Sequence, residues 1–293
     1  MIECKESLDV VGSAGGCEKI SFALKNTNWC NLKCAHCSEC SGPDVVPNIM
    51  PLDKVEKYIA EFNAMPMQKW EYMVFTGGET MAPYFHNQVE YMPRCLDIAA
   101  QHKMAPFVKT NGVWGGNDVM RSRILRDFAN AAYRNNILMS MDISVDAFHN
   151  NIQPVFKILN DVVRSDFLAP AIRISLCGFN DVRSQVAFMN VVNALRASGL
   201  TVESPHNGVF VLGVPGVRAM DVYYDLWTNV GNVGRAADNN LGKYVPSGQP
   251  DGAMGHCLQI DNNDVATLNY KHVAPVNGRT VYDVARELLA KTR

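Results

Sequence analysis

Four cysteines lie within twelve residues near the start of the chain, in the segment WCNLKCAHCSEC (29–40). Cys30, Cys34 and Cys37 have the spacing C-x3-C-x2-C, and Cys40 follows three residues later. Structural zinc sites usually draw their four ligands from two separated pairs of residues. Three thiolates on one short loop instead favour an iron–sulfur cluster, because thiolates are soft ligands. Three protein ligands leave one iron of a four-iron cluster open, and an open iron can bind a substrate.

A second motif suited to ligand binding is FTGGET (75–80), which follows a strand predicted at 71–76. Gly77 and Gly78 have no side chains, so the backbone there can approach a ligand closely. Glu79 comes next, and a carboxylate after two glycines at a strand end seldom has a purely structural use. The motif therefore predicts a binding loop with one acidic group.

Two further motifs also begin where a strand is predicted to end. KTNG (109–112) carries Asn111, and SVDAFHN (144–150) carries Ser144 and Asp146. Short polar side chains at a strand end can form hydrogen bonds with the hydroxyl groups of a ligand. Asp146 has an alternative role as the cap of the helix that follows.

The order and spacing of these motifs resemble those of the radical S-adenosylmethionine (radical SAM) superfamily. CNLKCAHC (30–37) is similar to the C-x3-C-x-aromatic-C loop of that family, with His36 in the aromatic position. FTGGET resembles its glycine-glycine-glutamate motif, and KTNG and SVDAFHN resemble its third and fourth strand ends. The resemblance covers residues 19 to about 213.

The resemblance implies a [4Fe–4S] cluster held by Cys30, Cys34 and Cys37, with S-adenosylmethionine chelating the fourth iron. It also implies contacts to that cofactor. They comprise Gly77, Gly78 and Glu79 near the methionine ammonium, Ser144 and Asp146 at the ribose, and His36 and Asn111 around the nucleoside. One electron would then cleave the sulfonium and yield a 5′-deoxyadenosyl radical, which abstracts hydrogen from a substrate.

Alternating β-rich and helical patterns position these motifs. Strands are predicted at 19–27, 71–76, 106–110, 137–146, 171–178 and 208–213. One helix begins at a capping box of Asp53 and Glu56, a second lies within 87–102 and is kinked or restarted at Pro93, and a third covers roughly 118–134. Strand–helix units spaced by roughly 30–35 residues imply a parallel sheet with right-handed crossovers. We predict an α/β fold, in which residues 1–220 form a partial (β/α)6 TIM-type barrel, because six units fall short of eight. Residues 221–293 would form a small α+β extension.

The extension is similar to the SPASM-type extension of radical SAM enzymes, through NVGRA (232–236) and CLQIDNNDVATLN (257–269). In that family further cysteines bind auxiliary clusters, but only Cys257 remains here. We therefore predict one cluster, and an extension that caps the barrel and ends in a helix beginning at Thr280. Candidate substrate contacts in this part are Asn239, Tyr244, Tyr270 and Lys271.

Composition limits the remaining functions. The net charge of -2 gives no reason to expect nucleic acid or an anionic membrane as a partner, and no apolar run is long enough to span a membrane. Nine cysteines are an odd number for a disulfide framework, and the first residues do not resemble a secretion signal. We therefore expect a cytoplasmic protein.

The sequence leaves the final reaction open. The substrate would be a peptide or a small polar metabolite, and the electron donor a flavodoxin or ferredoxin. An epimerase would also need a hydrogen donor, for which Cys177 and Cys257 are the candidates. A small-molecule mutase or dehydrogenase is an alternative within the superfamily. A non-catalytic iron–sulfur or zinc protein is an alternative of another class, against which the glycine-glycine-glutamate motif argues.

Overall fold

The computed structural model describes residues 19–179, 181–203, 208–227, 239, 256–268 and 272–291. The strands are β1 (Ile20–Thr27), β2 (Lys69–Gly77), β3 (Ala105–Thr110), β4 (Met139–Ser144), β5 (Ile172–Phe179), β6 (Thr201–Glu203), β7 (Val209–Val214), β8 (Arg218–Trp227), β9 (His256–Asp261), β10 (Val265–Leu268) and β11 (His272–Pro275). The helices are α1 (Leu52–Asn63), α2 (Ala82–Phe85), α3 (Tyr91–Gln101), the 3-10 turn η1 (Val113–Gly116), α4 (Asp118–Asn135), α5 (Ile152–Arg164), α6 (Val182–Ala197) and α8 (Val281–Ala290).

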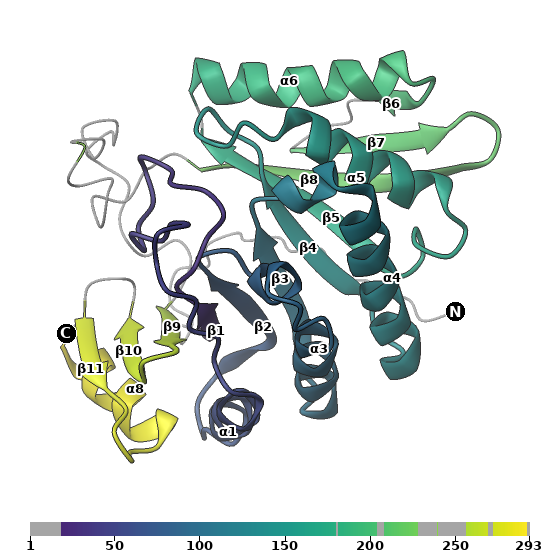
Figure 1. Cartoon of the computed structure of the whole chain (residues 1–293). Helices are drawn as coiled ribbons and strands as arrows, with labels where there is room; N and C mark the ends of the chain where they lie inside the picture. Colours follow the sequence, from purple (N-terminus) through teal and green to yellow (C-terminus); the bar gives the residue numbers. More distant parts are fainter. Residues whose placement is uncertain are drawn as a thin grey trace, which may run out of the picture.

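All of these strands join one sheet, in the order β11-β10-β9-β1-β2-β3-β4-β5-β8-β7-β6 (Figure 1). The seven described strands from β9 to β8 in this order run parallel to one another. The outer strands on both sides are antiparallel. The predicted α/β fold with a large parallel sheet is therefore confirmed, and in the described part of the chain the sheet has open edges at β11 and β6.

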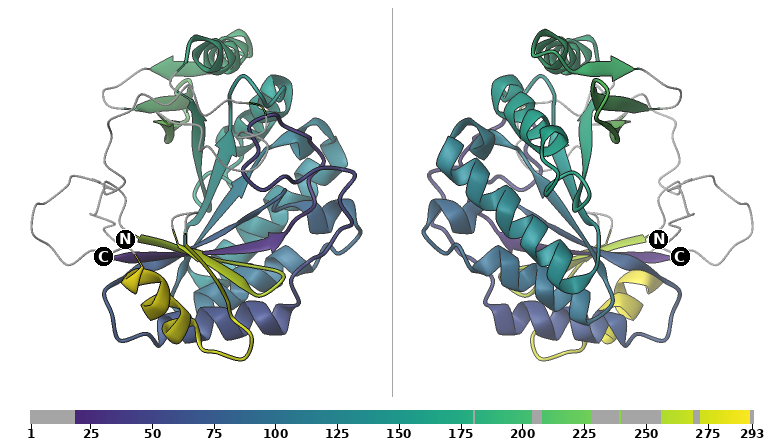
Figure 2. Two further views of the ribbon diagram at one scale, coloured as in Figure 1. Left: turned by 90° about the vertical axis from the view of Figure 1, so that its left-hand side faces the viewer. Right: turned by 90° about the vertical axis from the view of Figure 1, so that its right-hand side faces the viewer.

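The core lies between the sheet and helices α1, α3, α4 and α5, which cover one of its faces (Figure 2). Phe22 and Leu24 on β1, Phe75 on β2 and Ile143 on β4 point into this layer and are fully buried. Successive strand residues point to opposite faces. The alternate residues therefore face away from these helices, and that second face carries the polar groups described below.

The sixth parallel strand is not the segment predicted at 208–213. That segment forms β7, which pairs antiparallel with β8, and β8 is the strand that runs parallel to β5. The reason is a tight turn, in which Gly216 has a φ of +71° after Pro215 and the Val217 N–H donates to the Val214 carbonyl. Proline followed by glycine is typical of a type II turn, so this short signal predicts a hairpin rather than a crossover.

Two local helix predictions also differ from the structure. Helix α1 begins after Pro51, and no side-chain cap forms, so the capping box of Asp53 and Glu56 is wrong. Pro93 lies in the first turn of α3, where proline lacks only a hydrogen bond that the helix start would not make, so it causes no restart. The helix over 118–134 is confirmed as α4.

In the described part of the C-terminal extension, strands β9 to β11 lengthen the sheet beside β1, and Asn239 contacts the cysteine loop. Its final helix, α8, begins at the predicted cap, where Thr280 accepts from the Asp283 N–H. The predicted boundary at residue 220 falls within β8. No described helix is both long and apolar enough to cross a membrane.

Candidate functional site

The carboxyl ends of β2 to β5 and the loop after β1 surround one cavity of about 230 Å³. Carboxyl ends of parallel strands meet at one edge of a sheet, which is where α/β proteins bind their ligands. The lining residues are Cys30, Leu32, Cys34, His36, Cys37, Ser38, Glu39, Thr76, Gly77, Gly78, Lys109, Thr110, Asn111, Ser144, Asp146, His149, Cys177, Gly178 and Phe179. All four sequence motifs therefore contribute to one site.

The cysteine loop presents its three thiols to this cavity. Cys30, Cys34 and Cys37 all line it as free thiols, whereas Cys40 is exposed and does not. The N–H of Leu32 donates to Cys30 Sγ at 3.4 Å. Burial raises the pKa of Cys30 to about 12, and the Glu79 carboxylate and the two other thiols add to this. The sulfurs are thus close enough to repel one another as thiolates, an arrangement that a bound metal cluster would neutralise.

The two glycines hold the strand end against the start of the cysteine loop. A Cβ on Gly77 would lie 2.3 Å from the carbonyl oxygen of Thr27, and one on Gly78 would lie 2.1 Å from that of Trp29. Gly78 N–H donates to the Thr27 carbonyl and Glu79 N–H to the Trp29 carbonyl, both at 2.8 Å. The glycines therefore allow close contact with protein backbone as well as exposure to the cavity.

Glu79 is fully buried behind the cavity wall and is not among the lining residues. Its carboxylate accepts from the Thr110 hydroxyl at 2.6 Å, from Asn111 N–H at 2.8 Å and from Met81 N–H at 2.9 Å. Burial raises the pKa of Glu79, and these donors oppose the shift. The structure thus gives this residue a structural use, as a clamp between the ends of β2 and β3, which the sequence reasoning had considered improbable.

Asn111 also contacts the cysteine loop. Its side-chain Nδ2 donates to Asn31 Oδ1 at 2.8 Å and to Cys30 Sγ at 3.6 Å, while its Oδ1 accepts from Val113 N–H. The residue is only 6% exposed. It lines the cavity as expected for a nucleoside contact, but its amide is directed to a cysteine sulfur.

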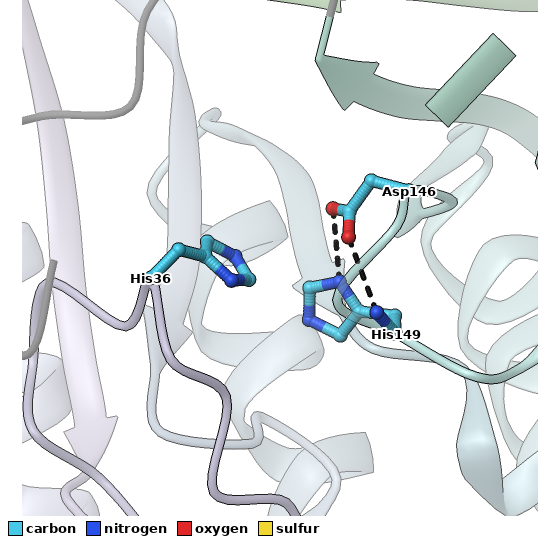
Figure 3. Close-up of side chains that lie close together, drawn as sticks. All are labelled: His36, Asp146 and His149. Carbon is cyan, nitrogen blue, oxygen red and sulfur yellow. Dashed lines mark hydrogen bonds and ion pairs between the residues drawn. The ribbon is translucent and has the colours of Figure 1, made fainter. Parts of the chain in front are cut away.

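His36, Asp146 and His149 come together at the side of the cavity between the cysteine loop and the segment after β4 (Figure 3). His149 Nδ1 lies 2.9 Å from Asp146 Oδ2, and Asp146 Oδ1 accepts from the N–H groups of Phe148 and His149. The His36 ring packs 4.4 Å from the Phe148 ring. Asp146 therefore fixes the local turn, and it does not cap α5, whose N-cap position is Asn151.

The charges in this group reinforce one another. Burial alone would lower the pKa of His149, but hydrogen bonds with Asp146 and Cys34 raise it to about 10. Burial alone would raise the pKa of Asp146, but His149 and then His36 lower it. An imidazolium beside a carboxylate and a cysteine sulfur is the state that this arrangement stabilises.

A row of polar side chains adjoins the cavity, and of its three residues only Lys109 lines the cavity itself. Lys109, Asp142 and Ser175 stand side by side on β3, β4 and β5. Lys109 Nζ lies 3.2 Å from Asp142 Oδ2, and Ser175 Oγ donates to Asp142 Oδ1 at 3.0 Å. Cys177 lies one step nearer the cavity, 3.7 Å from Ser144 Oγ, and burial raises its pKa. Sequence reasoning missed Lys109 and Asp142, although a charged residue inside an apolar strand is the signal that could have revealed them.

The remaining predicted residues lie elsewhere. Cys257 is on β9, opposite Ser21 of β1, and is not among the lining residues, so of the two candidate hydrogen donors only Cys177 faces the cavity. Asn239 Nδ2 donates to the carbonyl of Ala35 in the cysteine loop. The other predicted substrate contacts, Tyr244, Tyr270 and Lys271, fall outside the described residues.

Comparisons with known proteins gave structural neighbours only. The chain is similar to SuiB of Streptococcus suis bound to S-adenosylmethionine, with 9% identity, a TM-score of 0.45, and coverage of 92% of this chain and 66% of that one. It is also similar to anSMEcpe with bound AdoMet and Cp18Cys peptide, with 14% identity, a TM-score of 0.41, and coverage of 62% and 48%. No family model and no curated protein matches.

The chain thus spans about half to two thirds of the length of these neighbours. TM-scores below 0.5 do not establish a common fold. In the order of these motifs, and in the strand ends that present them, the chain is similar to the radical SAM superfamily.

Proposed function

We propose that the chain is a radical SAM enzyme, built on a partial (β/α)6 barrel with its core in residues 1–220 and an extension in 221–293. The observation that carries this proposal is the single cavity lined by Cys30, Cys34 and Cys37 together with the motifs at the ends of β2, β3 and β4. A passive metal site needs the cysteines alone, whereas a cofactor site needs the neighbouring strand ends as well.

The residues present fit a [4Fe–4S] cluster. Three soft thiolate donors share the cavity, and Cys30 already accepts N–H···S hydrogen bonds from Leu32 and Asn111, as thiolate ligands of iron do. When bound, the cluster would supply the electron that cleaves the sulfonium of S-adenosylmethionine, releasing the radical that abstracts hydrogen from the substrate.

The chain's own residues would hold S-adenosylmethionine beside the three cysteines. The N–H groups of Gly78 and Glu79 are used within the protein. The carbonyl oxygens of Gly77 and Gly78 would therefore bind the ammonium of the methionine part. Ser144 and Asp146 would bind ribose hydroxyls, and His36 would pack near the adenine.

The substrate would be polar, either a peptide or a small metabolite. Two ion pairs border the site, Lys109 with Asp142 at 3.2 Å and Lys25 with Glu39 at 2.9 Å. Charged walls bind polar groups and disfavour an extended apolar substrate, because the ion pairs would lose solvation without compensation. The electron donor would be a flavodoxin or ferredoxin. A mutase, dehydrogenase or epimerase outcome is compatible with this site, and in an epimerase Cys177, which lines the cavity, would be the hydrogen donor.

Anaerobic reconstitution tests the proposal. The protein is loaded with iron and sulfide, reduced with dithionite, and incubated with S-adenosylmethionine. We expect about four irons per chain and formation of 5′-deoxyadenosine, measured by mass spectrometry. Cys34→Ala should abolish both. Cys95→Ala is the matched control, because Cys95 is a buried free thiol of α3 outside the cavity, and it should retain both. An iron-loaded wild-type protein that forms no 5′-deoxyadenosine with candidate substrates would overturn the proposal.

A zinc site is a second candidate, favoured by His36, Asp146 and His149, whose ligand atoms all lie within 4.8 Å of one another. Zinc binds two histidines and one carboxylate in known protein sites. Metal analysis of protein purified without added metal separates the two. Stoichiometric zinc that is retained during anaerobic reconstitution would favour the zinc protein.

A further inference from the structure

The side chain of Asn111 is aimed at the sulfur of Cys30 by contacts that leave it no other orientation. Its Oδ1 accepts from Val113 N–H at 3.0 Å, which fixes which end of the amide is oxygen. Its Nδ2 must therefore face the other way, where it donates to Asn31 Oδ1 at 2.8 Å and to Cys30 Sγ at 3.6 Å.

The backbone of Asn111 is held as firmly as its side chain. Its N–H donates to Glu79 Oε2 at 2.8 Å, and its carbonyl accepts from Asn151 Nδ2, which also binds the Ser144 carbonyl at 2.6 Å. Asn111 is thus tied to the ends of both neighbouring strands. Because this donor is already ordered, its hydrogen bond to Cys30 costs no further conformational entropy when a ligand binds.

The contact is also dry. Asn111 and Cys30 are only 6% and 8% exposed, so little water competes for the sulfur. Hydrogen bonds are electrostatically stronger in such surroundings. The Leu32 N–H is a second donor to the same sulfur, but it belongs to the backbone of the cysteine loop itself. Asn111, by contrast, follows the end of β3, so this side-chain donor to Cys30 can be replaced without changing the sequence of the cysteine loop.

We infer that Asn111 is a positioning residue that donates an N–H···S hydrogen bond to Cys30, and that this bond raises the reduction potential of a cluster bound by the cysteine loop. This inference rests on the proposed function, since it supposes an iron–sulfur cluster on the loop. Hydrogen bonds to cluster sulfurs help to set the reduction potential. The reduced cluster carries one more negative charge, part of which lies on the thiolate sulfurs, so the bond stabilises the reduced form more than the oxidised one.

The test is an EPR-monitored redox titration of the reconstituted protein without substrate. Asn111→Ala removes the donor and adds no charge. Because one sulfur carries only part of the added charge, we expect the equilibrium constant for reduction to fall about threefold, which is roughly 28 mV more negative for a one-electron couple at 59 mV per tenfold change. An unchanged or more positive potential would overturn the inference.

Asn26→Ala is the matched control. Asn26 is also buried and lies at the end of β1, just before the cysteine loop, but its side chain donates to the Thr80 carbonyl and Met92 Sδ instead of a cysteine. It should leave the potential unchanged, and an equal shift in this variant would attribute the effect to general disturbance and overturn the inference. A wild-type protein without the EPR signal of a reduced [4Fe–4S] cluster would instead overturn the proposed function itself.

If Asn111→Ala does not bind iron, the hydrogen bond can be tested in protein that keeps Asn111. Pulsed EPR of reduced protein labelled with ¹⁵N in its asparagine side chains should show a ¹⁵N coupling to the cluster. The coupling should persist in Asn31→Ala, which removes the other nearby asparagine amide. Absence of the coupling in the wild type, or its loss in Asn31→Ala, would contradict the assignment to Asn111.

Discussion

Replacing Glu79 by glutamine separates a structural role from a role in binding a ligand. The exchange keeps the shape of the side chain but replaces one acceptor oxygen by a donor. Glu79 is fully buried, and its carboxylate accepts from Thr110, Asn111 and Met81. A glutamine oxygen can retain two of these donors. Its amide NH2 must then face the third, which is the Asn111 N–H if the oxygen keeps the other two.

The Thr110 hydroxyl cannot relieve this conflict by reversing its direction. Its oxygen already accepts from Trp114 Nε1–H at 2.9 Å and from Gly112 N–H at 3.2 Å, so its proton goes to Glu79. A buried donor left without an acceptor costs about 1–3 kcal/mol. We therefore expect Glu79→Gln to lower the free energy of unfolding by about 2 kcal/mol. This corresponds to a decrease of about 4 °C in Tm for a chain of this size.

Urea unfolding of metal-free protein, followed by tryptophan fluorescence and far-UV circular dichroism, measures this difference without any contribution from a cofactor. Glu90→Gln is the control, because the Glu90 side chain is 78% exposed and pairs only with the exposed Arg123 in the described residues. We expect it to change stability by less than about 0.5 kcal/mol. Equal stability of wild type and Glu79→Gln would refute the clamp, and would return Glu79 to a role in binding.

Two further predictions concern the cysteine loop and the C-terminal strands. Gly78→Ala would place a Cβ 2.1 Å from the Trp29 carbonyl oxygen, so iron bound after reconstitution should fall by more than half; full iron content would contradict the close contact. Asp264→Asn should destabilise the fold by about 1 kcal/mol at pH 7, because its carboxylate accepts from Lys54 and Tyr58. Burial alone would raise the pKa of Asp264, but these donors lower it below 3.8, so the difference in urea unfolding should vanish as the pH falls below that value; a constant difference would contradict it.

The position of the site could be predicted because its signals are local. The spacing of the three cysteines needs no knowledge of the rest of the chain, and FTGGET (75–80) ends a run of β-forming residues. Period and composition were sufficient to find β1 to β5 and the helices α1, α3 and α4. The hairpin of β7 and β8 could also have been predicted, since Pro215 and Gly216 form its turn. The regular spacing of strand–helix units instead suggested a further parallel strand at 208–213.

The partners within the site could not be predicted, because they depend on the register of strands far apart in the sequence. Whether Glu79 faces a ligand or the N–H of Asn111 follows from how β2 and β3 align, and 31 residues separate the pair. Likewise, Lys109 and Asp142 become an ion pair only because they are opposite one another on β3 and β4. A shift of one residue in that pairing would separate them.

The pairing of β1 with β9 has a consequence for the order in which the protein is made. One edge of β1 stays unpaired until β9, which begins at His256, has been synthesised. The cysteine loop leaves the ribosome long before that. At about 5–20 residues per second, the interval is roughly 10–45 s. During that time the nascent chain exposes an unpaired strand edge beside its cysteine loop, and an unpaired edge is a template for pairing with another chain.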